Sequence, residues 1–365
     1  MKKFITFLIL ALFLMPTITI NAEKNVNNQN ISLPTAFSWK DVDGVDYTTP
    51  IKDQTPAPTC ESYALCASLE TIMQYKTQEL FAPDLSETHL YFYAGGTVAA
   101  GYVNLMDAAD YLIEHGVPDE GCYPDPHRPF DYQFQSLSGW ENRTVKIQEW
   151  GWVDHGIESI KTALLEYGPL IVCISFTVDF FYYTGGVYTP KWGKHGGGHV
   201  VTLVGYDDEN ECWILKNSWG KGWGEKGWFR MAYDADIIAT WYGEGTGVMY
   251  IDGLYGNFKP DVPKVNIEKP TFLHTYLFGR GIPTIFRKLP IQQGAARIFG
   301  NLEIIVSADN TNSIDFYIDD ELIETDYEEP FSCNLEASRG LHTIKIIASN
   351  DYNTSLDLED IFIFF

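Results

Sequence analysis

The sequence predicts an α+β chain in which a helical half precedes an antiparallel β half, with an all-β module after them. Three patterns carry this prediction. Apolar side chains recur at spacings of three and four after residue 60, which is typical of a buried helix. Short runs of β-branched and aromatic residues fill residues 131–255. Beyond residue 270, apolar and polar residues alternate between turn sequences, which is typical of a β-sandwich.

We expect the elements in a fixed order along the chain. Helices are predicted at residues 60–78, 85–93, 105–115 and 157–167, the third closed by Gly116. Strands of the β half are predicted at residues 145–148, 170–175, 199–206, 213–217 and 227–232. Strands of the terminal module are predicted at residues 301–308, 314–318, 322–325, 341–348 and 356–364.

Size and charge allow two domains and disfavour a nucleic-acid partner. The 365 residues suffice for two domains, and 45% of them are apolar. The formal net charge of −24 lacks the basic excess on which binding to phosphates depends. An acidic surface favours solubility and says nothing about the fold.

The first 22 residues have the form of a secretory signal peptide. Lys2 and Lys3 precede a short apolar run, and the small residue Ala22 follows it. The run is short for a membrane span, although an uncleaved anchor is the alternative. We therefore expect a secreted, extracellular protein with no membrane span after signal removal. Residues 23–32 are polar and rich in asparagine, which predicts a disordered lead-in.

Six cysteines allow disulfides in an exported protein, but the sequence leaves their pairing open. If one cysteine is reserved as a nucleophile, at least one other cannot pair within the chain. Cys66 with Cys122, and Cys173 with Cys212, are the two candidate pairings. The sequence has no Cys-x-x-Cys motif and no His/Cys cluster, so neither a metal nor a cofactor is expected.

A cysteine at the start of the first predicted helix is the candidate nucleophile. A rigid segment with Pro56 and Pro58 leads into Cys60, and Thr59 is a plausible N-cap. Unpaired N–H groups and the helix dipole favour an anion at a first turn. A thiol there can lose its proton at neutral pH, and the thiolate is the nucleophile.

Three further residues have the types and the order that this chemistry needs. His199 lies in the run GGGHVVTLVGY, about 140 residues after Cys60. Asn217 lies in the run KNSWGKGWGEKGW, and Gln54 lies shortly before Cys60. A nucleophile, a base and an orienting amide are typical of covalent catalysis at a carbonyl. Each residue alone has an ordinary structural explanation, so the prediction depends on their joint order and spacing.

These motifs resemble those of the papain-like cysteine peptidases, the cathepsins and their relatives. The likeness covers residues 33–255, including LPTAFSW at Leu33 and LSE at Leu85. It implies a papain-like domain of two lobes, one helical and one an antiparallel β-barrel, with the active-site cleft between them. It also implies a cysteine endopeptidase that acts on protein or peptide substrates.

The same resemblance implies a role for each candidate residue. Cys60 attacks the peptide carbonyl as a thiolate, and His199 holds it as an ion pair and then protonates the leaving amine. Asn217 accepts a hydrogen bond from the other imidazole nitrogen. The Gln54 side chain and the Cys60 backbone N–H donate to the oxyanion. Trp219 shields the bond between His199 and Asn217 from water.

A glycine-rich stretch at residues 94–104 is expected to pair its backbone with the substrate, because glycine lets another chain approach closely. Gly101, before Tyr102, is the preferred position. Gly95 and Gly96 are alternatives, and an ordinary loop is the other explanation.

The pocket for the substrate residue two before the scissile bond is implied by the same resemblance. Its walls would come from Val103 or Met106, Cys173 and Gly198, which are apolar or small. An apolar substrate side chain is therefore expected there. The full set of expected substrate-binding residues is Gly101, Tyr102, Cys173, Gly198 and Trp219.

The neighbours of the nucleophile depart from the family pattern. The family usually has CGSCW, whereas this chain has APTCE, with Ala57 in place of a disulfide cysteine and Pro58 in place of a glycine. Glu61 replaces an aromatic residue. A carboxylate beside a thiolate raises the pKa of the thiol. Alternatively, Glu61 points to solvent in the first turn, where acids are favoured.

Relatives also usually carry a long inhibitory propeptide. Residues 23–32 are too few to fold into one. We therefore expect that activity is not restrained in this way, or that another partner restrains it.

The terminal module is expected to follow a linker. Residues 256–270 contain three prolines and predict a linker or a first edge strand. Residues 271–365 predict a sandwich whose runs DFYIDDELIETDYEEPF and GLHTIKIIA resemble Ig-like modules of secreted prokaryotic proteins. A spacer role and a contact with a cell surface or substrate are both open. Cys333 is expected in its core.

Two other functions stay open from the sequence. The altered neighbours of Cys60 favour a binding protein with a slow or inactive peptidase fold. The intact set of Gln54, Cys60, His199 and Asn217 favours an active peptidase. A transpeptidase would use the same acyl transfer, and only product analysis would separate it from hydrolysis.

Overall fold

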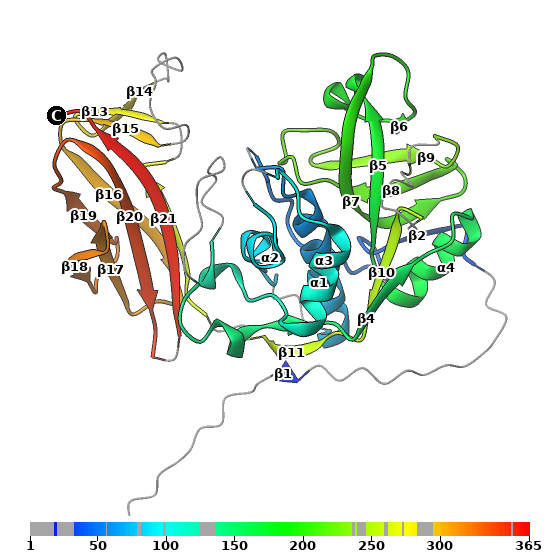
Figure 1. Cartoon of the computed structure of the whole chain (residues 1–365), viewed down its shortest axis with the longest axis horizontal. Coiled ribbons are helices and arrows are strands. Elements are labelled where there is room, and N and C mark those ends of the chain that lie inside the picture. Colours follow the sequence, from blue (N-terminus) through cyan, green and yellow to red (C-terminus); the bar gives the residue numbers. More distant parts are fainter. Residues whose placement is uncertain are drawn as a thin grey trace, which may run out of the picture.

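The computed structural model describes residues 18–19, 33–55, 57–78, 82–97, 100–124, 136–235, 238, 246–258, 262–271, 274–282, 295–351 and 353–365. The terminal β module, the helical half and the β half follow one another along the longest axis of the molecule (Figure 1). The predicted signal peptide and lead-in lie outside these residues except for Ile18 and Thr19, and Pro56 also lies outside them.

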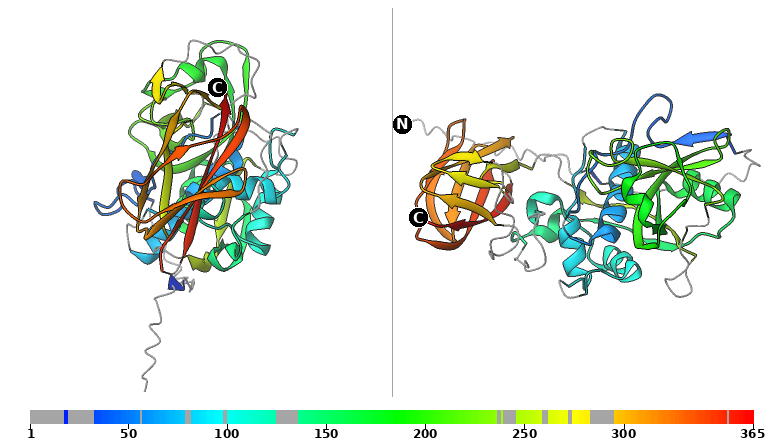
Figure 2. Two further views of the ribbon diagram at one scale, coloured as in Figure 1. Left: turned by 90° about the vertical axis from the view of Figure 1, so that its left-hand side faces the viewer. Right: turned by 90° about the horizontal axis from the view of Figure 1, so that it is seen from above.

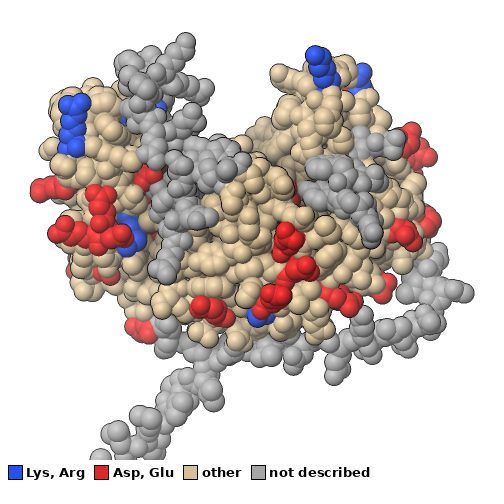
Figure 3. Space-filling view, viewed as in Figure 1, with Lys and Arg blue, Asp and Glu red and all other residues tan. Residues whose placement is uncertain are grey.

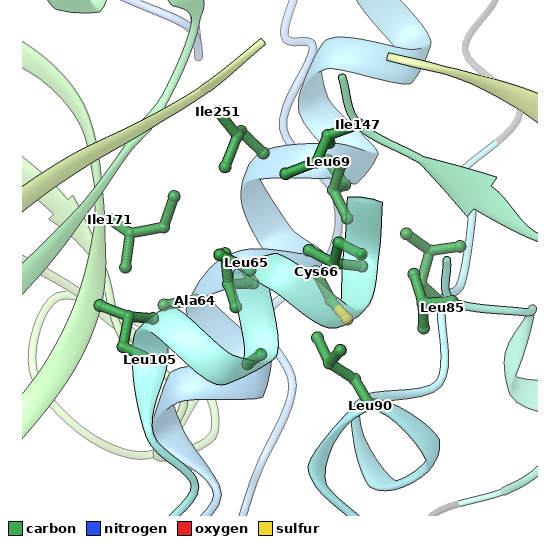
Figure 4. Close-up of a cluster of buried hydrophobic side chains, with 14 of the residues drawn as sticks. Ala64, Leu65, Cys66, Leu69, Leu85, Leu90, Leu105, Ile147, Ile171 and Ile251 are labelled. Carbon is green, nitrogen blue, oxygen red and sulfur yellow. The ribbon is translucent and has the colours of Figure 1, made fainter. Parts of the chain in front are cut away.

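The helix that begins at the candidate nucleophile is the buried centre of the helical half. α1 spans Cys60–Thr77, close to the predicted ends, and Leu65, Cys66 and Leu69 on it are fully buried. Figure 4 shows these side chains surrounded by apolar residues of the neighbouring segments. Thr59 occupies the N-cap position as predicted, although its side chain makes no cap hydrogen bond.

The other predicted helices are confirmed, and α2 and α3 pack against α1. Ser86 and Asn104 cap them by accepting hydrogen bonds from backbone N–H groups of the first turn. The remaining described helices and 3-10 turns are α2 (Glu87–Tyr93), α3 (Leu105–Glu114), α4 (Ile157–Tyr167), η1 (Glu120–Cys122), η2 (Trp140–Arg143) and η3 (Val178–Tyr182).

The β half is an eight-stranded, largely antiparallel sheet. Its strand order is β4-β10-β5-β7-β8-β9-β6, with β2 paired to β7. Within the described residues the order does not close between β4 and β6, so the expected barrel is an open sheet. The strands are β2 (Ala36–Ser38), β4 (Glu149–Trp152), β5 (Leu170–Thr177), β6 (Val187–Tyr188), β7 (His195–Asp207), β8 (Cys212–Lys216), β9 (Trp228–Ala232) and β10 (Val248–Asp252).

The central strand β7 is buried on both faces, which fixes its register. Val200 packs in the core around α1, and the Thr202 hydroxyl donates to the Ala64 carbonyl of that helix at 3.1 Å. Val201 and Leu203 face the second core, on the other side of the sheet. Successive side chains of a strand point to opposite faces, so β7 joins the two cores.

The terminal module consists of two sheets around one core (Figure 2). The predicted strands are confirmed, and Cys333 is buried in the core as expected. Part of the expected linker is strand β12, which favours the edge-strand alternative. One sheet has β12 (Lys264–Lys269), β16 (Leu302–Asp309) and β19 (Ser332–Leu335). The other has β14 (Arg280–Ile282), β13 (Thr275–Leu277), β15 (Ala296–Phe299), β21 (Thr354–Ile363), β20 (Gly340–Ser349), β17 (Ser313–Ile318) and β18 (Glu321–Asp326).

Several strands were not predicted from the sequence, among them β13, β14, β15 and β19. The strand predicted for the β half at residues 145–148 is shorter and belongs to a different, three-stranded sheet under the helical half, so that assignment is wrong. The order of this sheet is β1-β11-β3, from β1 (Ile18–Thr19), β11 (Tyr255–Phe258) and β3 (Val145–Lys146). The unpredicted strands β1, β13 and β14 carry too few residues to show an alternating pattern.

The terminal module docks on the helical half through one buried arginine. Arg143 donates to both carboxylate oxygens of Asp119, at 2.8 and 2.5 Å, and to the Thr354 carbonyl at 2.7 Å. Gly121 lies against Ser355, and a Cβ at Gly121 would clash with the Ser355 hydroxyl. The module is therefore seated by polar contacts and close backbone approach.

All six cysteines have free thiols, so both candidate disulfides are wrong. On the sheet, Cys173 of β5 lies opposite Val200, whereas Cys212 of β8 lies opposite Asp207, at the other end of β7. Cys66 is packed in the helical core.

Acidic side chains are spread over the face shown in Figure 3, and the few basic ones stand apart from one another. Among the described residues, no helix combines the length and the apolar character needed to cross a bilayer.

Candidate active site

The candidate nucleophile is the first residue of α1 and is partly exposed. The preceding loop is folded back by a hydrogen bond from the Ala57 N–H to the Gln54 carbonyl, at 2.8 Å. The loop is attached to the β half because the Gln54 N–H donates to the Ser218 carbonyl at 2.9 Å. Cys60 is therefore placed by a helix that is buried behind it and by a loop that both halves hold.

The histidine and asparagine predicted as its partners are in direct contact. His199 Nε2 lies 2.8 Å from Asn217 Oδ1, and both residues are buried. His199 is on β7, and Asn217 directly follows β8, the neighbouring strand. Burial lowers the pKa of His199 to about 4, against a smaller opposite effect of Asn217. This shift favours the neutral form of the imidazole at neutral pH.

The tryptophan after this asparagine covers the pair. The Trp219 ring stacks on His199 with centroids 4.7 Å apart and planes at 26°. Phe181 stacks on the outer face of the indole at 5.5 Å, and Phe176 meets the imidazole edge-on at 6.4 Å. This aromatic packing restricts the tilt of the imidazole and limits its contact with water.

The predicted oxyanion donor has an orienting partner that the sequence analysis missed. Ser218 donates to Gln54 Oε1 at 2.5 Å, and Gln54 Nε2 donates to the Ala57 carbonyl at 3.0 Å. A primary amide has two N–H donors, so one bond to Ala57 leaves the second for a ligand. Ser218 stands beside Asn217 in the KNSW run, which is the only sequence feature that could have indicated it.

The nucleophile itself contacts a carboxylate. Cys60 Sγ donates to Glu61 Oε2 at 3.5 Å, and Glu61 is only 4% exposed. The expectation that Glu61 could point to solvent is therefore wrong. Burial and the Glu61 charge raise the pKa of Cys60 well above its ordinary value, while the Val200 backbone N–H lowers it. Burial therefore shifts both the Cys60 thiol and the His199 imidazole toward their neutral forms.

Some of the expected substrate-binding residues are accessible at the surface, whereas Cys173 is buried in the core. Tyr102 is 57% exposed, and Gly198 is exposed on β7 opposite Ser175. Gly101 has φ of +66° and lies beside Pro58, next to the nucleophile. Cys173 has no exposed surface, so it cannot form a wall of a substrate pocket.

The alternatives for the same pocket and loop are also placed. Val103 is buried in the helical core, and Met106 is partly exposed and packs against that core, as Cys60 does. Gly95 has φ of +95° and open space around its Cα, whereas a Cβ at Gly96 would clash with the Tyr91 carbonyl. Gly96 is therefore explained by packing.

A buried ionic cluster behind the site was also missed. Lys52 Nζ pairs with Glu70 at 3.1 Å and with Glu87 at 2.7 Å. Lys216, the last residue of β8, donates to the Thr49 hydroxyl at 2.9 Å, and Thr49 donates to Glu70 at 2.5 Å. The cluster connects the strand that ends beside Asn217 to the middle of the nucleophile helix. Glu70 in the apolar pattern of that helix was the available sequence clue.

No group of three or more His, Cys, Asp or Glu side chains within the described ranges is arranged to hold a metal ion. The groups that the structure brings together at this site are a thiol, an imidazole, the Asn217 amide that contacts it and the Gln54 amide.

The comparisons with known proteins agree on one family. The family described as papain family cysteine protease matches residues 33–245. Cysteine proteinase 2 of Entamoeba histolytica is 31% identical over 245 residues, 64% of this chain and 75% of that protein. Fruit bromelain of Ananas comosus is 31% identical over 209 residues, 56% of each chain. A solved structure of the bromelain protease from Ananas comosus with the E64 inhibitor is 28% identical, with a TM-score of 0.47, covering 62% of this chain and 100% of that chain.

Proposed function

The chain belongs to the papain family of cysteine proteases and is a cysteine-type peptidase, and from this premise we propose that it is a secreted endopeptidase that acts through a thioester acyl-enzyme. The observation that carries the proposal is the buried contact of 2.8 Å between His199 and Asn217. It lies under Trp219 and next to the nucleophile, because the Val200 N–H reaches the Cys60 sulfur.

The first step is transfer of the thiol proton to the imidazole. Asn217 holds Nε2 of His199, so Nδ1 is the nitrogen that takes the proton from Cys60. The thiolate then attacks the peptide carbonyl carbon, and a C–S bond forms. His199 returns the proton to the leaving amine as the C–N bond breaks, which leaves a thioester on Cys60.

The second step returns the free enzyme. Water attacks the thioester carbonyl with His199 as base, and the acid product leaves as the thiol is restored. In both steps the oxyanion accepts hydrogen bonds from the second N–H of Gln54 Nε2 and from the Cys60 backbone N–H. The latter is at the start of α1, where N–H groups lack partners within the helix. Such preorganised donors favour the transition state over the planar substrate.

The substrate residue two before the scissile bond is proposed to be apolar. Met106 is partly exposed and Gly198, next to His199, is exposed, while Val103 lies in the core against which both Met106 and Cys60 pack. The backbone of Gly101 is the proposed partner of the substrate chain. A peptide library that selects a charged residue at this position would overturn the assignment.

Export and the terminal module belong to the same proposal. The apolar run that ends before Ala22 supports secretion. The two-sheet module is proposed to be Ig-like, acting as a spacer or as a contact with a cell surface or substrate. The hydrogen bond from Arg143 to the Thr354 carbonyl of the module holds it beside the helical half.

The decisive experiment compares the gently reduced full chain with its Cys60→Ala variant on an unstructured protein substrate. Cleavage at internal bonds by the parent alone, mapped by mass spectrometry, is the expected result. Cleavage by both proteins would place the activity elsewhere. No cleavage, together with alkylation of Cys60 no faster than that of a free thiol, would favour the binding protein instead.

A further inference from the structure

The residue after the nucleophile places a second acid in the same helix turn. Glu61 is the second residue of α1 and is 4% exposed, so its carboxylate lies within the protein. Its Oε2 atom is the acceptor for the Cys60 thiol at 3.5 Å. The positive end of the helix dipole favours an anion in this turn. Cys60 and Glu61 therefore compete for the same stabilisation.

The hydrogen bond to Glu61 excludes the one that catalysis needs. A thiol has a single hydrogen, so a thiol that donates to Glu61 Oε2 does not donate to His199. The S–H bond must rotate away from the Glu61 carboxylate before the thiol proton can pass to His199 Nδ1.

Other ionisable groups lie close to the Glu61 carboxylate. On the helix itself, Cys60 faces Glu61. Tyr91 of α2 and Cys173 of β5 both interact electrostatically with Glu61. Cys60 in turn interacts with Cys173 and with the backbone N–H of Val200 on β7, next to His199. Ionisation of one acid in this group disfavours ionisation of the others, and burial strengthens the effect.

We propose that Glu61 is a positioning residue that holds the Cys60 thiol in a protonated resting arrangement and thereby sets how much reactive thiolate the enzyme has. The inference rests on the proposed role of Cys60 as nucleophile. The step moves one proton, from sulfur to His199 Nδ1, and Glu61 remains a carboxylate throughout. Removal of its charge leaves the thiol free to donate to the imidazole.

The test is the pH dependence of alkylation at Cys60, resolved from the other cysteines by peptide mass spectrometry after iodoacetamide treatment of the full chain. In Glu61→Gln, the midpoint of the rate profile is expected to fall by at least about one pH unit. At a pH below both midpoints the rate then rises about tenfold. Glu61→Asp keeps the charge on a shorter side chain, so a smaller downward shift is expected. Glu158→Gln is the control, because Glu158 is an exposed acid in the first turn of α4.

An unchanged or higher midpoint in Glu61→Gln would overturn the proposal. The pH midpoint of Cys60 alkylation in the unsubstituted protein is a second test, which needs no variant. This midpoint is expected above the ordinary cysteine value of about 8.5, and a midpoint below that value would equally overturn the proposal. Alkylation requires no peptide cleavage, so failure here is distinct from failure of the proposed peptidase function, which is scored by cleavage in parallel.

Discussion

On the β side of the active site, His199 and Asn217 lie in a buried strand pair under stacked aromatic rings, whereas on the helical side Cys60 is partly exposed beside a carboxylate. The β side keeps the family motifs, and its geometry needs many packed neighbours. The helical side departs from them at Ala57, Pro58 and Glu61 while the nucleophile stays in place. The imidazole is thus held by packing, whereas the thiol is held next to one buried carboxylate, which we propose sets its reactivity.

The largest effect is expected where both sides meet, at Gln54. Gln54→Ala removes an oxyanion donor and should lower kcat by about 10²–10³-fold with a smaller change in KM. The measurement is steady-state cleavage of a quenched peptide. Thr55→Ala, at the exposed neighbour, is the control. Equal losses in both variants would mean that the loop as a whole, and not the amide, is responsible.

The next effect tests the β side. Asn217→Ala breaks the bond of 2.8 Å to His199 and leaves a buried nitrogen without its partner. The loss of about 1–3 kcal/mol corresponds to a fall in kcat/KM of roughly 5-fold to 160-fold. The exposed Asn210→Ala is the control. Full activity in Asn217→Ala would show that Trp219 and Phe176 orient the imidazole without the amide.

A smaller effect is expected at Ser218, which acts through Gln54. Ser218→Ala removes the hydrogen bond to Oε1 and should cost about 1 kcal/mol, roughly fivefold in kcat. Ser218→Thr keeps the hydroxyl and should recover most of the activity. If Ser218→Thr is as slow as Ser218→Ala, volume in the loop and not the hydroxyl explains the loss.

The last prediction concerns stability on the helical side and leaves activity at neutral pH unchanged. His89 is fully buried between the rings of Tyr93 and Trp140, and burial lowers its pKa from 6.5 to about 3. Between these pH values the unfolded chain binds a proton that the folded chain does not. Stability therefore falls as the pH drops below 6.5, by about 1.4 kcal/mol per pH unit for one proton.

His89→Phe keeps the ring stacking and removes this proton. The dependence of unfolding free energy on pH between 6 and 4, measured by urea denaturation, should weaken by about one proton. His155→Phe, at an exposed histidine, should leave it unchanged. An unaltered slope in His89→Phe would mean that His89 is protonated in the folded chain.

The helices and the long strands could be predicted from local periodicity, and the contact between His199 and Asn217 from motifs with fixed spacing. The sequence-based predictions were wrong where the burial or position of a side chain depends on segments that are distant along the chain. Glu61 belongs by position to an exposed first turn, yet the packing of α1 against β5 and β7 encloses it. Cys173 and Cys212 are both on the sheet, but only the register of β7 shows them to be far apart. The short strands β13, β14 and β15 depend on pairing partners that local sequence does not reveal.

The covalent intermediate on Cys60 is the most direct test of the account. The full chain is mixed with a peptide ester, quenched in acid within the burst, and analysed by peptide mass spectrometry. The account predicts an acyl group on the Cys60 peptide that hydroxylamine removes and that Cys60→Ala lacks. An acyl group on another residue, or turnover of the ester with Cys60 unmodified at every quench time, would contradict it.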